Sequence, residues 1–138
     1  MAEPRRPQPS FPEPDTQPFW DATKQHELRY QTCNACNAVV FFPRRHCPSC
    51  MGFDLSWQTS KGEGTVYTCT VIRQIGHPFF RGRAPYVVAW IDLDEGFRML
   101  SNVVGVDDPT TVTIGQRVRV TWEDQEDGVS MPVFEPVE

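Results

Sequence analysis

The sequence contains no apolar run that could cross a bilayer. Its longest uninterrupted apolar stretch, residues 86–91, has six residues, whereas a spanning helix needs about 20. The N-terminus is rich in proline and arginine and lacks the apolar core of a secretory signal. We therefore expect a cytoplasmic protein that is not bound to membranes, in which the five cysteines stay reduced.

Basic residues are scarce in the last third of the chain. The 138 residues carry 13 basic and 18 acidic side chains, and from Asp92 onward the counts are 3 basic against 11 acidic. A chain with a net charge of −5 is not a polycation that seeks nucleic-acid phosphates. Any anion-binding surface is therefore expected in the first two-thirds of the chain. The length fits one ordinary domain or two very small ones.

Motifs of several enzyme classes are also missing. The sequence has no glycine-rich phosphate loop, serine nucleophile elbow or H-E-x-x-H motif. The carboxylates of Asp92, Asp94 and Glu95 precede a glycine, and we interpret them as turn residues rather than as an acid–base pair. A dyad of Cys69 and His77 stays open as an alternative, although a lone cysteine on a strand usually behaves as a small buried apolar residue.

The first part of the chain is dominated by proline. Residues 1–18 hold six of the 13 prolines and are predicted to form a disordered or extended arm, because they cannot bury enough apolar surface to offset their ordering entropy. A short helix is expected next, capped by Thr16 and running to about His26, which would be solvated. One face of this helix is expected to pack on the following residues: Phe19, Trp20 and Thr23.

Four cysteines carry the strongest signal. They form two C-x-x-C pairs separated by ten residues: Cys33, Cys36, Cys47 and Cys50. Three predicted strands surround them, at residues 28–32, 38–42 and 55–59. This layout is typical of a zinc ribbon, in which four thiolates hold one Zn²⁺ at about 2.3 Å and leave no position for water or substrate. A structural zinc site is predicted, with iron in a rubredoxin-like site as the chemical alternative.

The turns around these cysteines have matching chemistry. Pro48 is expected to fix the second turn, with Gly52 close behind it. Asn37 follows the first pair at a position where such turns favour a residue that tolerates positive φ.

The pattern changes after Gly62 and Gly64 to a series of antiparallel strands. Five are predicted, at residues 65–74, 86–93, 97–104, 116–124 and 129–137. Tight turns are expected at 94–96 and 126–128, and one helical turn at 109–112. Five strands with a short element between the third and fourth fit an OB-fold barrel. The predicted fold is thus mostly β: arm 1–18, helix and rubredoxin-like zinc ribbon 19–60, and a five-stranded OB-fold 61–138.

The loop at residues 75–85 is long for a connection between paired strands. It combines aromatic and basic side chains, which suit contact with a partner surface or an anionic ligand. The alternative is that one phenylalanine closes the end of the barrel and the arginines are solvated. Together with two basic residues of the ribbon, the candidate contacts are Arg44, Arg45, His77, Phe79, Phe80, Arg81 and Arg83.

Several short segments resemble one known family. They are residues 41–44 before the second cysteine pair, and then 62–67, 85–88, 94–96 and 114–115. The chain from Phe19 onward is similar to the bacterial and archaeal family in which a rubredoxin-like zinc ribbon precedes an OB-fold associated with acyl-CoA metabolism. Members of that family have a glycine after the first cysteine pair, where this chain has Asn37.

The resemblance implies a non-catalytic subunit with one structural zinc. It would bind and stabilise an enzyme of the thiolase superfamily, such as a thiolase, an acyltransferase or a steroid side-chain aldolase, and the candidate contacts above would meet that enzyme or CoA. A single-stranded nucleic-acid-binding protein is the alternative, with Tyr67, Trp90 or Phe97 as its stacking residues. Electron transfer at an iron site is a third.

Overall fold

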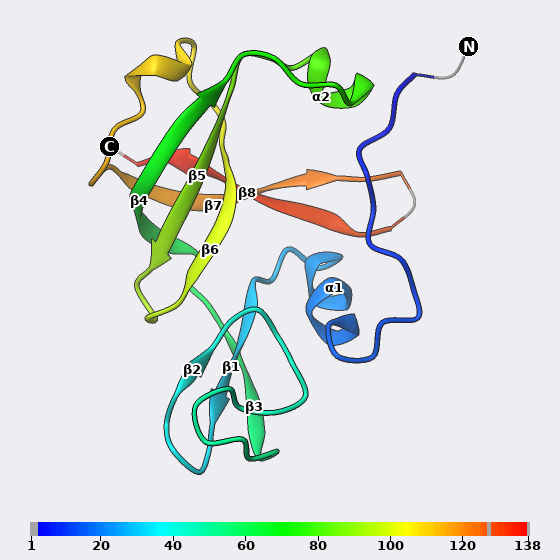
Figure 1. The fold of residues 1–138 in the computed structure, drawn as a ribbon, viewed down its shortest axis with the longest axis vertical. Helices are drawn as coiled ribbons and strands as arrows, with labels where there is room; N and C mark the ends of the chain where they lie inside the picture. The colour runs from blue at the N-terminus through cyan, green and yellow to red at the C-terminus, as the bar shows by residue number, and fades with distance from the viewer. Residues whose placement is uncertain (1–2, 127, 138) are drawn as a thin grey trace.

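The computed structural model describes residues 3–126 and 128–137. A three-stranded sheet lies at one end of the molecule and a closed five-stranded barrel at the other, with helix α1 (Gln17–Thr23) beside the hairpin that β7 (Arg117–Asp124) and β8 (Ser130–Pro136) form (Figure 1). The predicted fold class, a zinc ribbon followed by an OB-fold barrel, is confirmed. No helix in the described ranges has both the length and the apolarity to span a bilayer.

Helix α1 starts where the sequence predicts and ends earlier. Thr16 occupies the N-cap position, but its side chain makes no capping hydrogen bond. Phe19 and Thr23 are buried, as expected for the packed face. The predicted end of the helix at about His26 is wrong, because the helix ends at Thr23 and His26 has a positive φ of 59°. His26 is exposed, as predicted.

The ribbon sheet has the order β2-β1-β3. Its strands are β1 (Arg29–Cys33), β2 (Val39–Val40) and β3 (Leu55–Thr59), all antiparallel. Strand β2 is shorter than predicted because Phe41 and Phe42 leave the sheet and pack on Phe19, with ring centroids 5.8 and 5.6 Å from its ring.

The barrel closes in the order β4-β5-β6-β8-β7. Its remaining strands are β4 (Glu63–Ile72), β5 (Tyr86–Leu93) and β6 (Arg98–Val103), and the 3-10 turn η1 (Pro109–Thr111) follows β6. Strands β6 and β8 meet in parallel at Val103 and Phe134, which closes the barrel. Alternate residues of β5 point into the core, and the intervening residues point outward.

The connections between the barrel strands match the sequence prediction only in part. The turn at 94–96 joins β5 and β6 as expected. The predicted turn at 126–128 joins β7 and β8, but its Asp127 lies outside the described residues. Helix α2 (Pro78–Arg81) in the 75–85 loop was not expected. It begins after Pro78 with the Nδ1 of His77 accepting a hydrogen bond from the Phe79 N–H, so a local cap forms it without any helical periodicity.

Ribbon and barrel share one hydrophobic core. Phe19 and Leu28, which precede the ribbon sheet, belong to the same buried cluster as Ile91 and Phe134 of the barrel. The connection after β3 is also fixed, because the Glu95 carboxylate accepts hydrogen bonds from Ser60 Oγ at 2.7 Å and from the Lys61 N–H at 2.8 Å. The two units therefore meet through a packed joint.

A polar network ties the residues around α1 to the β7–β8 hairpin. The buried hydroxyl of Thr23 accepts a hydrogen bond from the Ser130 N–H at 3.1 Å. The Asp124 carboxylate accepts one from Ser130 Oγ at 2.8 Å and lies 2.6 Å from His26 Nε2. The His26 ring stacks on Trp122 at 5.3 Å between centroids. His26 is thus a structural residue.

This network predicts an acid-sensitive contribution to stability. Hydrogen bonds from His26 and then Ser130 lower the pKa of Asp124 below its ordinary 3.8. A carboxyl whose pKa is lower in the folded than in the unfolded state stabilises the fold above its unfolded pKa, and this contribution disappears as the pH falls through the folded pKa. We expect Asp124→Asn to lower the melting temperature at neutral pH, and the difference from wild type to shrink from about pH 5 to about pH 3. Asp107→Asn, an exposed residue outside the network, is the control; a pH-independent difference for Asp124→Asn would contradict the assignment.

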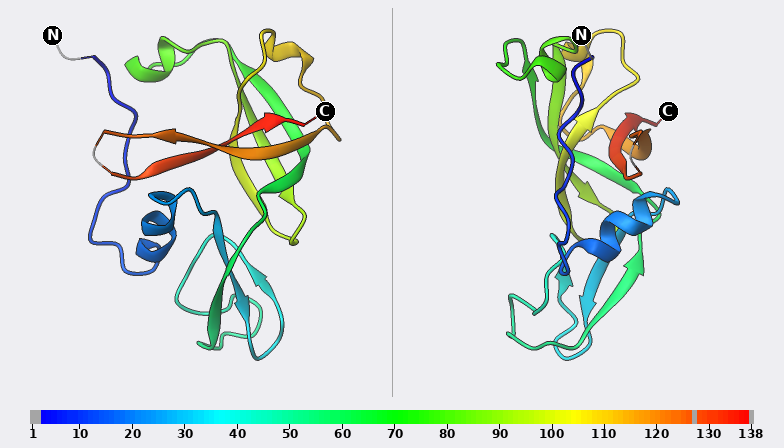
Figure 2. Two further views of the ribbon diagram at one scale, coloured as in Figure 1. Left: turned by 180° about the vertical axis from the view of Figure 1, so that it is seen from behind. Right: turned by 90° about the vertical axis from the view of Figure 1, so that its right-hand side faces the viewer.

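The proline-rich segment crosses the β7–β8 hairpin (Figure 2). Residues 3–16 contain no helix or strand, which agrees with an extended arm. Arg6 nevertheless makes specific contacts, donating hydrogen bonds to Glu123 at 2.7 Å and to Asn102 at 3.3 Å. The domain limits at residues 18 and 60 stay predictions.

Candidate functional site: a four-cysteine metal centre and an apolar groove

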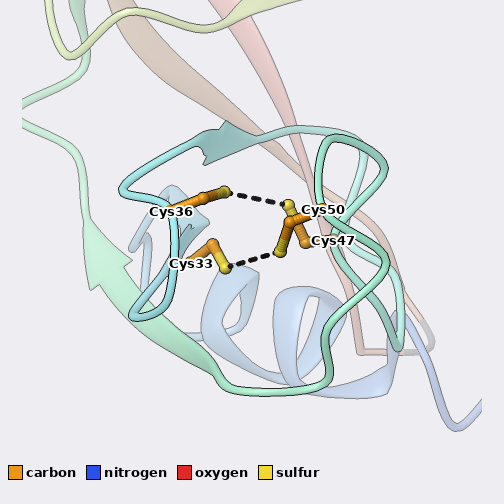
Figure 3. A group of neighbouring side chains, drawn as sticks. All are labelled: Cys33, Cys36, Cys47 and Cys50. Carbon is orange, nitrogen blue, oxygen red and sulfur yellow. Dashed lines mark hydrogen bonds between the residues drawn. The ribbon is translucent and has the colours of Figure 1, made fainter.

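The four paired cysteines converge between the two turns of the ribbon (Figure 3). The sulfur of Cys33 lies 3.6 Å from that of Cys50, and the sulfur of Cys36 lies 3.6 Å from that of Cys47. All four sulfurs lie within 4.8 Å of one another. The 3.6 Å separations are much longer than a disulfide bond of about 2.05 Å. Cys33 ends β1 and Cys36 lies in the β1–β2 turn, whereas Cys47 and Cys50 lie in the loop before β3.

The sulfur geometry fits one tetrahedral zinc ion. Four sulfurs about 2.3 Å from a Zn²⁺ would be separated by about 3.8 Å, close to the spacing observed here. Backbone N–H groups of Cys50 and Ser49 point at the Cys47 sulfur and lower the pKa of this thiol to about 6. Bound zinc would offset half of the charge of the four thiolates and crosslink the two turns, and with four protein ligands it would have no open position for catalysis.

The two turns are built alike. The N–H of Asn37 donates to the Cys33 carbonyl oxygen at 2.9 Å, and the N–H of Met51 donates to that of Cys47 at 2.8 Å. Asn37 and Met51 have φ values of 63° and 66°. The expectation for Asn37 is confirmed. In the second turn it is Met51, and not Gly52, that adopts the left-handed conformation, because the cysteine spacing places it at the equivalent position.

A methionine at this position is strained. The left-handed region costs a non-glycine residue about 1–2 kcal/mol, and the Met51 side chain is largely exposed, so that its loss removes little packing. We expect Met51→Gly to raise the free energy of unfolding by about 0.5–1 kcal/mol after the entropy that glycine gains in the unfolded chain is subtracted. Thermal unfolding of the zinc-loaded protein measures it. Phe53→Gly, at an exposed ribbon position without positive φ, is the matched comparison and should not gain stability, and a destabilised Met51→Gly would contradict the strain.

The other predicted contact residues fall into two separate groups. Arg44 and Arg45 are exposed on the ribbon, whereas His77, Phe79, Phe80, Arg81 and Arg83 belong to the 75–85 loop at the far end of the molecule (Figure 1). Arg81 donates to the carbonyl oxygens of Ile75 and Gly76. Arg83 donates to Glu123 at 2.7 Å. Phe80 lines a groove on the barrel.

The groups that resembled acid–base or nucleophilic chemistry have structural contacts. Asp92 pairs with Arg98, and Asp94 with Arg117, with shortest separations of 2.6 and 2.7 Å. The Cys69 sulfur contacts the Val112 carbonyl oxygen, while His77 caps α2. Asp94 and Glu95 lie in the turn after β5, as predicted, whereas Asp92 belongs to β5 itself. The Cys–His dyad is not formed.

The groove is the feature that the sequence analysis missed. It has a volume of about 660 Å³ and is lined mainly by apolar side chains of α1, β5, β6, β8 and the segment after β2. Trp90 and Leu100 are paired across β5 and β6 on the outward face of the barrel. A signal was present: residues 86–91 are apolar at every position, whereas a strand with one face in water alternates.

A nucleic-acid platform is poorly supported by the same face. Of the three proposed stacking residues, Phe97 is buried against Tyr30 and Phe41. The Arg98 guanidinium lies over one face of the Tyr67 ring, 3.4 Å from its centroid, and Tyr67 as a whole is half exposed.

Comparison with known proteins gives consistent matches. Residues 20–56 match the rubredoxin-like zinc ribbon domain of ChsH2, and residues 57–123 match the C-terminal OB-fold domain of ChsH2. A probable enoyl-CoA hydratase alpha subunit from Thermomonospora curvata is 38% identical over 86% of this chain, and a DUF35 domain-containing scaffold protein from Methanocaldococcus jannaschii is 35% identical over 70%. The chain spans 36% of the first relative and 71% of the second.

A solved structure described as an Ltp2-ChsH2(DUF35) aldolase contains a similar chain. It is 35% identical, superposes with a TM-score of 0.83, and the match covers 94% of this chain and 98% of that one. Fold and metal centre together define a zinc-ribbon and OB-fold protein with one structural zinc site. The chain belongs to the DUF35 family, and within it matches the ChsH2 domains.

Proposed function

We propose that this chain is a non-catalytic subunit that binds and stabilises an enzyme of the thiolase superfamily acting on acyl-CoA. The observation that carries the proposal is the match over nearly the whole length of a chain in a structure described as an Ltp2-ChsH2(DUF35) aldolase. The scaffold description of the methanogen relative supports a structural role. The enoyl-CoA hydratase description of another relative supports an acyl-CoA substrate for the complex.

The chemistry of the described residues supports a subunit without its own turnover. The metal centre offers four protein ligands and no open position, which is the pattern of a structural zinc site. We assign Cys33, Cys36, Cys47 and Cys50 as the zinc ligands, and the arginine and aromatic residues of the ribbon and the 75–85 loop as contacts with the partner or with CoA. The complex is placed in the cytoplasm, where thiolates stay reduced and available to zinc.

Affinity purification from the native host tests the proposal. The tagged chain should enrich a thiolase-superfamily subunit, identified by mass spectrometry, and the tagged Cys47→Ser chain should enrich it far less. The purified chain alone should give no thiolase, hydratase or aldolase turnover with acyl-CoA substrates, whereas addition of the enriched subunit should. Turnover by the partner-free chain, or enrichment of single-stranded nucleic acid in place of such an enzyme, would contradict the proposal.

A further inference from the structure

The outward face of the barrel beside α1 carries a groove with an apolar floor and walls. Its exposed walls come from three separate elements: Trp90 on β5, Leu100 on β6 and Phe42 after β2 are 41%, 53% and 47% exposed. Three large apolar side chains that converge on one hollow form a continuous patch. Such patches on soluble proteins mark interaction sites, whereas apolar residues scattered singly do not.

Three polar side chains of the groove are already engaged within the chain. Ser101 Oγ donates to the Pro132 carbonyl oxygen, and Asn102 Nδ2 donates to that of Val87, both at 2.8 Å. The Arg98 guanidinium is paired with Asp92. These three side chains are therefore not available to orient a polar ligand, and most of the remaining lining is apolar or aromatic.

Beside the groove, at its end next to α2, two guanidinium groups share one carboxylate; Arg6 lines the groove, and Arg83 lies next to it. The guanidinium groups of Arg6 and Arg83 each lie 2.7 Å from an oxygen of the same carboxylate, that of Glu123. Both are also close to the rings of the α2 segment, with Arg83 4.6 Å from the Phe79 centroid and Arg6 5.5 Å from that of Phe80. Within the described part of the chain, one carboxylate thus faces two guanidinium groups. A second carboxylate would complete this cluster.

We propose that the groove is the docking surface for the catalytic subunit, which places an apolar ridge over Trp90, Leu100 and Phe42 and a carboxylate beside Arg83. The inference rests on the proposed function, because the occupant is the thiolase-superfamily subunit named there. Aromatic, methionine and arginine side chains are enriched at the cores of protein interfaces, and they dominate here. A few side chains buried near the centre of an interface, most often Trp, Tyr and Arg, supply most of its affinity.

The openness of the groove favours a protein over a small molecule. A small-ligand site usually encloses 70–90% of its ligand and presents a few placed polar groups. Here the main walls are about half exposed, and three polar lining side chains, those of Arg98, Ser101 and Asn102, are engaged within the chain. A partner surface covers such a hollow from outside, which removes the exposed rings from water.

Binding of the separately purified catalytic subunit to groove variants tests the assignment. Leu100→Asp puts a charge in the centre of the groove, and Phe42→Ser removes an apolar wall on another element. Ile114→Asp is the matched control, since Ile114 is 70% exposed and does not line the groove. We expect Leu100→Asp to raise the dissociation constant by at least about 30-fold and Phe42→Ser to raise it by about 10-fold. The dissociation constant of Ile114→Asp should stay within about threefold of the wild-type value. Zinc content and circular dichroism verify that each variant is folded.

The charged end has its own test. Arg83→Gln removes the excess positive charge, so it should weaken binding about fivefold and flatten the dependence of the dissociation constant on salt. Arg119→Gln is the control, because Arg119 pairs with Glu135 at 2.9 Å outside the groove. An unchanged salt dependence for Arg83→Gln would overturn the assignment of a carboxylate to this end.

The other outcomes separate the groove from the proposed function. If the wild-type chain binds the catalytic subunit and both groove variants bind equally well, the groove assignment is overturned and the proposed function stands. If the wild-type chain does not bind such a subunit, both are overturned. If the chain alone forms a dimer in sedimentation that Leu100→Asp dissociates, a second copy occupies the groove and the assignment is overturned.

Discussion

Removal of zinc with a strong chelator is expected to unfold the ribbon, residues 29–59. The buried cluster within the ribbon is small: Cys33, Val40 and Cys47, with Ala38 and Leu55 packed against it. Two of its three buried members are themselves predicted zinc ligands, so the metal and the core are lost together. Zinc binding supplies about 10–16 kcal/mol in peptides of comparable size, far more than this cluster can. Trp57 fluorescence and near-ultraviolet circular dichroism, with metal analysis on the same sample, measure the effect.

Cysteine variants sharpen this prediction. Cys47→Ser should lose stoichiometric zinc and the ordered ribbon, and Cys69→Ser, which changes a partly buried thiol of the barrel, should keep one zinc per chain. The purified protein should be colourless. A red, iron-containing protein would contradict the zinc assignment, and a Cys47→Ser chain with wild-type zinc content and unfolding would contradict the ligand set.

Phe19→Ala is expected to destabilise the protein by about 3–5 kcal/mol, as for other fully buried phenylalanines. Phe19 is 1% exposed and belongs to the same buried cluster as the barrel core. Its ring also contacts Trp20 and Phe41, with centroids 4.9 and 5.8 Å away. The substitution opens a cavity where helix, ribbon and barrel meet, so both units should lose stability in one transition. Chemical denaturation followed at two wavelengths measures this.

Phe53→Ala is the matched control for this substitution. Phe53 lies in the ribbon and is 74% exposed, so its truncation should change the free energy of unfolding by less than about 0.5 kcal/mol. A Phe19→Ala protein whose barrel unfolds at the wild-type denaturant concentration while only its ribbon is loosened would show that Phe19 does not couple the two units.

Local chemistry explains which parts of the fold could be predicted from the sequence. The cysteine spacing places the sulfurs together because each pair sits on one tight turn. The strands at 55–59 and 86–93 have the predicted limits, since alternation and flanking turn residues act within a few positions. These signals need no knowledge of the rest of the fold.

The misses depend on contacts between distant segments. Helix α2 has only four residues and too short a pattern to be recognised. His26 leaves the helix to reach Asp124, which lies 98 positions further along the chain. The groove brings together α1, β5, β6 and β8, so only the closed barrel assembles it. The sequence shows that β5 has apolar side chains at its outward positions, but it does not show which other elements pack beside them to form the groove.

The hydrogen bonds that the Glu95 carboxylate accepts from Ser60 and Lys61 affect how the chain assembles with an enzyme. A flexible connection at this point would let the ribbon and the barrel adopt many relative orientations. Complex formation would then have to restrict them to one, at a cost in entropy. With the connection held by two hydrogen bonds of 2.7 and 2.8 Å and by a common interior, that entropy is already spent during folding. An enzyme that touches both halves meets a preorganised template, and association costs correspondingly less.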